Sequence, residues 1–221
     1  MSQWISISQP LKRLLLIALL STVLVACEKA PEKEALMMPE VYAPAMGAVA
    51  INPRGHLILV SFFDYTSLDA RKIFPDLLAL AHKDTDIRFI SRVLPMLGEE
   101  SAMVASLAVA AQFQGMQLPL NDGLLTSKFQ LTKEHVLNIA KVTGLDVAKL
   151  EADVSKPQVS AQINENISIA HRLGIQQVPA YVVAYADDFN NVVSASLVQG
   201  SVSVEQLKQL LDELANNVKK Y

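Results

Sequence analysis

The sequence predicts an α/β fold with an all-helical insertion, and two features carry this prediction. Short apolar runs rich in β-branched and aromatic residues occur in two pairs, at 57–63 and 87–94 and again at 179–185 and 192–198, which is typical of buried strands. Between the two pairs, residues 98–173 carry apolar side chains at helical spacing only. A chain of 221 residues with 51% apolar residues is long enough for one such domain.

The first pair of strands encloses a predicted helix. Residues 71–83 place apolar side chains at helical spacing, and Pro75 is expected to kink this helix. Because strand, helix and strand follow in this order, the strands at 57–63 and 87–94 are predicted to be parallel. The second pair flanks residues 187–191, a turn-rich stretch that favours a hairpin.

Capping residues delimit the remaining helices. Thr132 is expected to cap one helix of the insertion, and Ser203 is expected to cap the terminal helix at 203–218. Gly115, Gly144 and Gly174 are placed where helices end. The predicted helices of the insertion are 99–114, 132–142, 146–154 and 159–173.

The charge balance and the cysteine count exclude several classes of function. The chain has 19 basic and 22 acidic residues and no block of like charge, so we expect no nucleic-acid partner. Its one cysteine, Cys27, cannot form an intramolecular disulfide, a dithiol pair or a cysteine-rich zinc site. The four histidines show no spacing typical of metal ligands, so we expect neither a metal nor a cofactor.

The first residues of the chain are similar to a bacterial lipoprotein signal peptide at 1–26. Lys12 and Arg13 precede an uncharged apolar run at 14–26, which is shorter than the roughly 20 residues that cross a bilayer and typical of a secretory signal. The run ends in Leu24-Val25-Ala26-Cys27, which resembles a lipobox. The resemblance implies cleavage before Cys27 and lipidation of its sulfur, a stable anchor when several acyl chains are attached.

The lipobox resemblance also implies a location in the bacterial cell envelope, facing the periplasm. Glu28 stands where Asp would signal retention in the inner membrane, which favours the outer membrane. Two alternatives for Cys27 stay open, an ordinary buried cysteine after a signal peptide and a short anchor that is never cut. Residues 27–47, with three prolines and alternating charge, are predicted to be a flexible tether.

Four short segments along the rest of the chain together resemble the sequence of a known protein family. They are Phe62-Phe63-Asp64-Tyr65, residues 94–101, residues 174–183 and Gln199-Gly200. With the helical insertion, they resemble the DsbA branch of the thioredoxin superfamily over about residues 47–218. The resemblance implies a thioredoxin-like fold built from 48–97 and 174–221, with residues 98–173 as its inserted all-helical domain.

The chain departs from that family at the residues that carry its redox chemistry. The family has Cys-x-x-Cys after the segment that resembles Phe62–Tyr65, and this chain has Ser67-Leu68-Asp69-Ala70. Disulfide exchange needs an attacking thiolate and a second thiol to resolve the mixed disulfide. Since Ser67 and Ala70 supply neither, we expect no thiol–disulfide oxidoreductase activity. Ser67 is expected to keep the role of helix cap.

The resemblance implies that Val178-Pro179 forms the cis-proline loop, whose backbone pairs with extended peptides in this superfamily. Pro179 as a purely structural turn is the alternative. Apolar contacts to a peptide are expected around this loop from Phe63, Tyr65, Leu68 and Tyr181.

These residues leave three functions open. The first is an adaptor or structural subunit of a membrane-associated envelope complex, a secretion system for example, with partners in the envelope and an anchor at Cys27. The second is a periplasmic holdase chaperone for unfolded peptides. The third is a hydrolase with Ser67 as nucleophile, which needs a base from one of the histidines, His56, His82, His135 and His171.

Overall fold

The structure is a computed structural model that describes residues 33–188 and 191–218. The expected signal peptide, the lipobox and Cys27 lie outside the described residues. Within the part of the chain that the structure describes, no helix combines the length and the apolar character needed to cross a membrane.

The centre of the fold is a sheet of five strands in the order β1-β3-β2-β4-β5. β2 and β3 are parallel, whereas β4 is antiparallel to both β2 and β5, so the predicted parallel pair and the predicted hairpin are both confirmed. β1 was not predicted, because two residues are too few to show a period. The strands are β1 (Ala50–Ile51), β2 (Leu57–Phe63), β3 (Ile87–Val93), β4 (Ala180–Asp188) and β5 (Asn191–Gln199).

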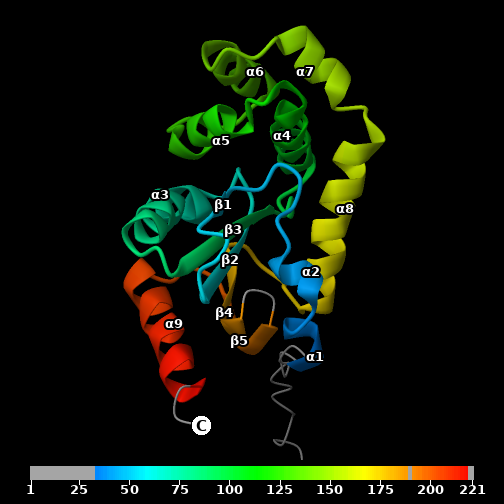
Figure 1. The fold of residues 1–221 in the computed structure, drawn as a ribbon. Helices are drawn as coiled ribbons and strands as arrows, with labels where there is room; N and C mark the ends of the chain where they lie inside the picture. Colours follow the sequence, from blue (N-terminus) through cyan, green and yellow to red (C-terminus); the bar gives the residue numbers. More distant parts are fainter. Residues whose placement is uncertain (1–32, 189–190, 219–221) are drawn as a thin grey trace, which may run out of the picture. The chain divides into compact units, whose positions relative to one another are not determined.

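Helices cover both faces of the sheet (Figure 1). α3 (Leu68–Lys83) and α9 (Val204–Val218) pack on one face, together with alternate β2 residues such as Leu57 and Leu59. α8 (Pro157–Arg172) and two short helices, α1 (Lys33–Leu36) and α2 (Pro39–Tyr42), pack on the other face. This division follows from the two-residue period of a strand, which sends successive side chains to opposite faces.

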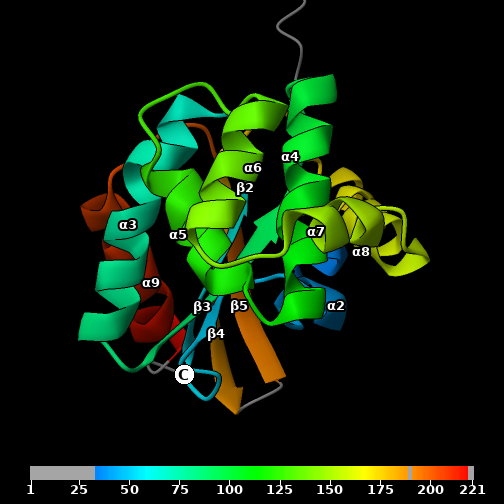
Figure 2. The same cartoon turned by 90° about the horizontal axis from the view of Figure 1, so that it is seen from above.

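The insertion consists of α4 (Glu99–Ala110), the 3-10 helix η1 (Ala111–Gln114), α5 (Gln117–Thr126), α6 (Lys133–Val142), α7 (Val147–Asp153) and α8. Viewed from above, α4, α5 and α6 lie over the sheet, between α3 on one side and α8 on the other (Figure 2). α5 was not predicted, since Pro119 and Gly123 interrupt its helical signal. Gly123 is needed for packing, because a Cβ atom there would approach Ile139 Cγ2 of α6 to 2.5 Å.

The capping predictions are confirmed, and the helix around Pro75 is continuous. Thr132 Oγ1 accepts a hydrogen bond from His135 N at 3.3 Å, and Ser203 Oγ accepts one from Gln206 N at 3.2 Å. Pro75 lies inside α3, which runs without interruption from Leu68 to Lys83.

The expected flexible tether at residues 27–47 includes an arm, residues 33–46, that is folded against the sheet. Leu36, Val41 and Tyr42 of this arm are buried. Arg92 of β3, only 1% exposed, donates hydrogen bonds to the arm's carbonyl oxygens at Glu40, Val41 and Ala43, and to Asn166 Oδ1 of α8. The arm's apolar residues follow no helical or strand period, so the sequence pattern alone does not reveal their burial.

Candidate functional site

The four residues of the expected degenerate motif, Ser67-Leu68-Asp69-Ala70, lie at the start of α3. Ser67 is the N-cap residue, and its Oγ accepts a hydrogen bond from Ala70 N at 3.3 Å. Ala70 is buried, whereas Leu68 projects outward with 73% of its surface exposed. The Ser67 oxygen is therefore used as a helix cap, where a redox protein would present a thiolate.

A buried carboxylate holds the turn before α3. Asp64 is 1% exposed and accepts hydrogen bonds from the backbone N–H groups of Thr66, Met96 and Leu97, at 2.9, 2.9 and 3.2 Å. The hydroxyls of Thr66 and Ser101 also donate to it. Asp64 thereby joins the β2–α3 turn to the loop that enters the insertion. An aspartate directly after an apolar run is a sequence signal that could have indicated this role.

The second expected element is the loop before β4. The peptide bond between Val178 and Pro179 is cis, and Pro179 is buried. The Pro179 carbonyl oxygen accepts a hydrogen bond from Gly200 N at 2.8 Å, which ties this loop to the segment that leads into α9.

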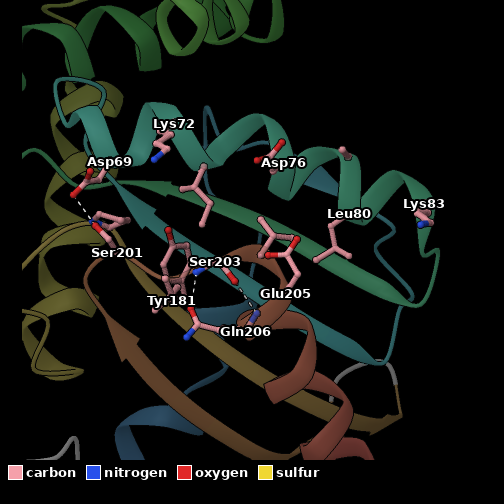
Figure 3. A pocket seen from close by; sticks show the side chains of 15 residues that line it. Asp69, Lys72, Asp76, Leu80, Lys83, Tyr181, Ser201, Ser203, Glu205 and Gln206 are labelled. Atoms are coloured by element: carbon pink, nitrogen blue, oxygen red, sulfur yellow. Dashed lines mark hydrogen bonds between the residues drawn. The ribbon is translucent and has the colours of Figure 1, made fainter.

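Asp69 and Pro179 line the same groove, which we call the α3–α9 groove. Its volume is about 640 Å³, and its walls are α3, the start of β4 and residues 201–206 at the start of α9. Asp76 of α3 and Glu205 of α9 come from opposite walls (Figure 3). The structure thus brings one residue of the expected degenerate motif, Asp69, and Pro179 of the cis-proline loop to one groove.

Tyr181 lies in the floor of the α3–α9 groove. Its side chain has no exposed surface, and its hydroxyl has no hydrogen-bond partner among the described residues. Burial raises the pKa of Tyr181, and the negative charge of Asp69 adds to this effect. Asp69 Oδ2 itself accepts a hydrogen bond from Ser201 Oγ at 2.6 Å, across one end of the groove (Figure 3).

The expected apolar contacts around the loop are wrong for two of the four residues. Phe63 and Tyr65 are buried in the core, where their ring centroids are 4.9 Å apart. Tyr65 also donates a hydrogen bond to Asn121 Oδ1 of α5 at 2.7 Å. Strand-end aromatics point into the core here because the insertion covers this end of the sheet. Only Leu68 is exposed, and Tyr181 lines the groove.

Exposed apolar side chains surround the start of α3. Besides Leu68, they include Leu97 at 57% and Phe129 at 70% exposed. Leu97 is held near the turn by Asp64. Arg71 Nη1 of α3 donates to the Phe129 carbonyl oxygen at 2.9 Å, which places the α5–α6 loop beside α3.

The histidines do not complete a nucleophilic site at Ser67. His56 pairs with Asp86 Oδ1 at 2.9 Å, and His135 Nε2 contacts Ser127 Oγ at 2.9 Å. Within residues 33–188 and 191–218, no hydrogen bond joins Ser67 to a histidine. A serine nucleophile needs such a base. The same described residues contain no group of three or more His, Cys, Asp or Glu side chains placed to hold a metal ion.

The fold defines a class, the thioredoxin fold with a DsbA-type helical insertion. The chain belongs to the DSBA-like thioredoxin domain family, whose profile matches residues 100–212. The matched region begins after the degenerate motif, so the family assignment is independent of Ser67 and Ala70.

Solved structures with this fold include redox proteins. A thioredoxin-like oxidoreductase from Silicibacter pomeroyi DSS-3 is 30% identical, with a TM-score of 0.69 over 84% of this chain and 98% of that chain. The catalytic domain of Proteus mirabilis ScsC is 24% identical, with a TM-score of 0.66 over 82% of this chain and 97% of that chain, and shows the fold alone.

A curated relative is much longer than this chain. The Na(+)/H(+) antiporter NhaA of Herminiimonas arsenicoxydans is 30% identical over 166 residues, which are 72% of this chain and 26% of the antiporter. The chain therefore spans about a quarter of the length of that relative.

Proposed function

We propose that the chain is a lipid-anchored envelope protein without redox activity, which acts by binding as an adaptor or structural subunit of a membrane-associated complex. One observation carries the proposal. The resemblance aligns Ser67 and Ala70 with the two family cysteines, and the Ser67 oxygen caps α3. The scaffold of a dithiol site is present without a thiol at either position.

The anchor is proposed at Cys27, the one cysteine of the chain. Lipidation would occupy its sulfur, so Cys27 would not supply redox chemistry either. The described part of the chain begins at Lys33 with α1. An extended chain spans at most roughly 3.6 Å per residue, so the six residues from Cys27 to Lys33 would hold the domain within roughly 20 Å of the membrane surface. The proposed surface faces the periplasm, and the outer membrane is favoured over the inner membrane.

The α3–α9 groove supports a binding role. It lies beside Val178-Pro179, the proposed peptide-binding loop, and it is lined from both sides by polar and charged side chains. We infer that this groove takes an extended segment of a partner protein. Leu68, whose side chain is exposed, directly precedes Asp69 of the groove wall in the chain.

A site-specific photo-crosslinker tests the adaptor role. The tagged full chain carries the crosslinker at Leu68 or, as control, at Val142 of α6, which is also apolar and is 87% exposed. After irradiation, membranes are extracted in mild detergent. We expect one partner in fixed ratio, crosslinked from position 68 and not from position 142.

Absence of such a partner overturns the adaptor role and favours a holdase. The exposed apolar residues Leu68, Leu97 and Phe129 are the observation that supports this second candidate. A holdase would crosslink many unfolded clients weakly and would suppress their aggregation. The anchor is tested separately, since Cys27→Ser should abolish incorporation of labelled palmitate and release the chain from the membrane.

A further inference from the structure

Another cavity lies on the α8 face of the sheet, and we call it the arm cavity. Its volume is about 590 Å³, and its walls are the arm at residues 33–46, β1 with the turn that follows it, β3 and the start of β5. Sites for small organic ligands in proteins have volumes of about 300–1,000 Å³. The arm cavity therefore has the size of a ligand site, and the described residues that line it are distinct from those of the α3–α9 groove.

Apolar side chains form most of the described lining of the arm cavity. The arm contributes Met37 and Tyr42, and the sheet contributes Ile51, Ile90 and Val192. Contact of such walls with water is unfavourable, and an apolar ligand relieves it by displacing the water. Recognition sites of this kind combine apolar walls with a few polar groups that orient the ligand. The lining therefore favours a ligand with an apolar body.

Arg88 of β3 is the one charged residue among the described residues that line the arm cavity. It is 6% exposed and lies on the same face as Ile90, because the two residues are two positions apart on one strand. Burial lowers the pKa of Arg88, since removal from water disfavours the charged form, yet an arginine stays protonated in proteins. An anion in the cavity would add a favourable interaction with this buried positive charge.

The other buried arginine on this face of β3 is placed differently. Arg92 is surrounded by acceptors of the chain, and it donates to three carbonyl groups of the arm and to Asn166 Oδ1. Arg88 lies at the wall of a cavity instead. A guanidinium has five N–H donors in a planar fork that matches a carboxylate. Arg88 can therefore hold a carboxylate in addition to its contacts within the chain.

We propose that the arm cavity binds a small carboxylate with an apolar body, such as a medium-chain fatty acid, whose carboxylate pairs with Arg88 and whose body lies between the arm and the sheet. Such binding goes beyond an adaptor role and is independent of the α3–α9 groove. The ligand would contact Met37 and Tyr42 of the arm and Ile90 of the sheet together, so it would also hold the arm against the sheet.

Isothermal titration calorimetry tests the proposal with sodium octanoate as the probe. The full chain is kept in dodecyl maltoside micelles, and titration into micelles without protein gives the blank. We expect saturable binding at one site, about tenfold tighter than that of hexanoate, which buries two fewer methylene groups. Octanamide has a similar shape without the charge. It should bind at least about tenfold more weakly than octanoate, because hydrogen bonds between charged groups are the stronger ones.

Two arginine variants form a matched pair. Arg88→Met removes the charge and keeps an apolar side chain, so it should weaken octanoate binding at least about tenfold and leave the affinity for octanamide unchanged. Arg54→Met is the control, because Arg54 is exposed, follows Pro53 of the cavity wall and carries the same charge. It should leave the affinity for octanoate unchanged. Unchanged octanamide binding shows that the cavity of Arg88→Met is still folded.

A third variant tests the cavity without touching Arg88. Val192→Trp places a larger side chain in the wall at the start of β5, so it should weaken the binding of octanoate and octanamide alike. The proposal is overturned if octanoate gives no heat above the blank, if octanamide binds as tightly as octanoate, or if Arg88→Met and Arg54→Met have equal effects. It is also overturned if Val192→Trp binds octanoate as wild type does, because the carboxylate then binds outside the arm cavity.

Discussion

Single residues decide whether this scaffold carries redox chemistry. α3 retains the features that activate a thiol in this fold, a capped N-terminus and 16 residues of aligned peptide dipoles. At the first of the two positions, Ser67 Oγ accepts a hydrogen bond from Ala70 N. At the second, the Ala70 side chain is a buried methyl group. Under the proposed function, the absence of redox chemistry is therefore local to two side chains.

Because only the side chains at positions 67 and 70 are concerned, we predict that redox activity can be introduced by replacing these two residues. In a Cys27→Ser background, Ser67→Cys with Ala70→Cys should confer thiol–disulfide oxidoreductase activity, because the new thiol at position 67 lies at the helix N-terminus, where its pKa is lowered. The measurement is the reduction of insulin by dithiothreitol with and without the variant. Ser67→Cys alone is the control and should form mixed disulfides without turnover. An inactive but folded double variant would contradict the prediction.

Asp64 is the residue whose loss should cost the most stability near the site. Asp64→Asn keeps the volume but places an amide against the N–H groups of Met96 and Leu97, so at least one buried donor loses its acceptor. We expect the free energy of unfolding to fall by about 3 kcal/mol, measured by urea denaturation. Asp122→Asn, on the exposed surface of α5, should change it by less than about 0.5 kcal/mol. Equal effects of the two variants would refute this role.

Among the elements, the arm at residues 33–46 depends on one side chain of the sheet. Arg92 donates to three arm carbonyl groups from a buried position, whereas the exposed Arg172 forms an ion pair with Glu40 of the same arm at 2.8 Å. Arg92→Met should lower the free energy of unfolding by about 3 kcal/mol. Arg172→Met should lower it by less than about 1 kcal/mol.

Hydrogen exchange locates the effect of these two variants. In Arg92→Met, the amides of α1 and α2 should exchange faster than in wild type, because the carbonyl groups of the arm lose their donors. In Arg172→Met, exchange in the arm should change little. The docking role of Arg92 is refuted if exchange in the arm is the same in both variants.

Elements with a clear period could be predicted from the sequence, and elements without one could not. The run at 57–63 matches β2 because every position there is apolar or small and both faces are buried. α5 escaped prediction because Pro119 lies in its first turn and Gly123 is required by Ile139 of another helix. Such a requirement depends on a contact between distant residues, which a single sequence does not display.

In the candidate site, too, some features could be predicted from the sequence and others could not. Ser67, Ala70 and Pro179 could be found by resemblance to a family motif. The α3–α9 groove could not, because its walls come from three separate segments of the chain. The unpaired hydroxyl of Tyr181 is likewise a property of packing. Its position in a predicted strand indicated only that it would be buried.

At the scale of the whole molecule, buried tyrosines on both faces of the sheet make the stability of the fold depend on pH. Tyr42 lies in the core on the α8 face, Tyr65 and Tyr181 in the core on the α3 face. Burial raises the pKa of all three, and at Tyr42 the charge of Arg88 partly opposes it. Both layers of the fold thus hold neutral phenols that an unfolded chain would ionise at about pH 10.

We therefore predict that stability falls as the pH rises above about 10. There the unfolded chain releases phenolic protons that the folded chain retains, so the free energy of unfolding decreases with pH, whereas below that pH the contribution of the neutral phenols is fully present. Urea denaturation across the alkaline range measures this slope, and tyrosinate absorbance shows when the buried phenols ionise. Tyr65→Phe should make the slope shallower. If all tyrosines ionise near pH 10 while the chain stays folded, the explanation by buried phenols is wrong.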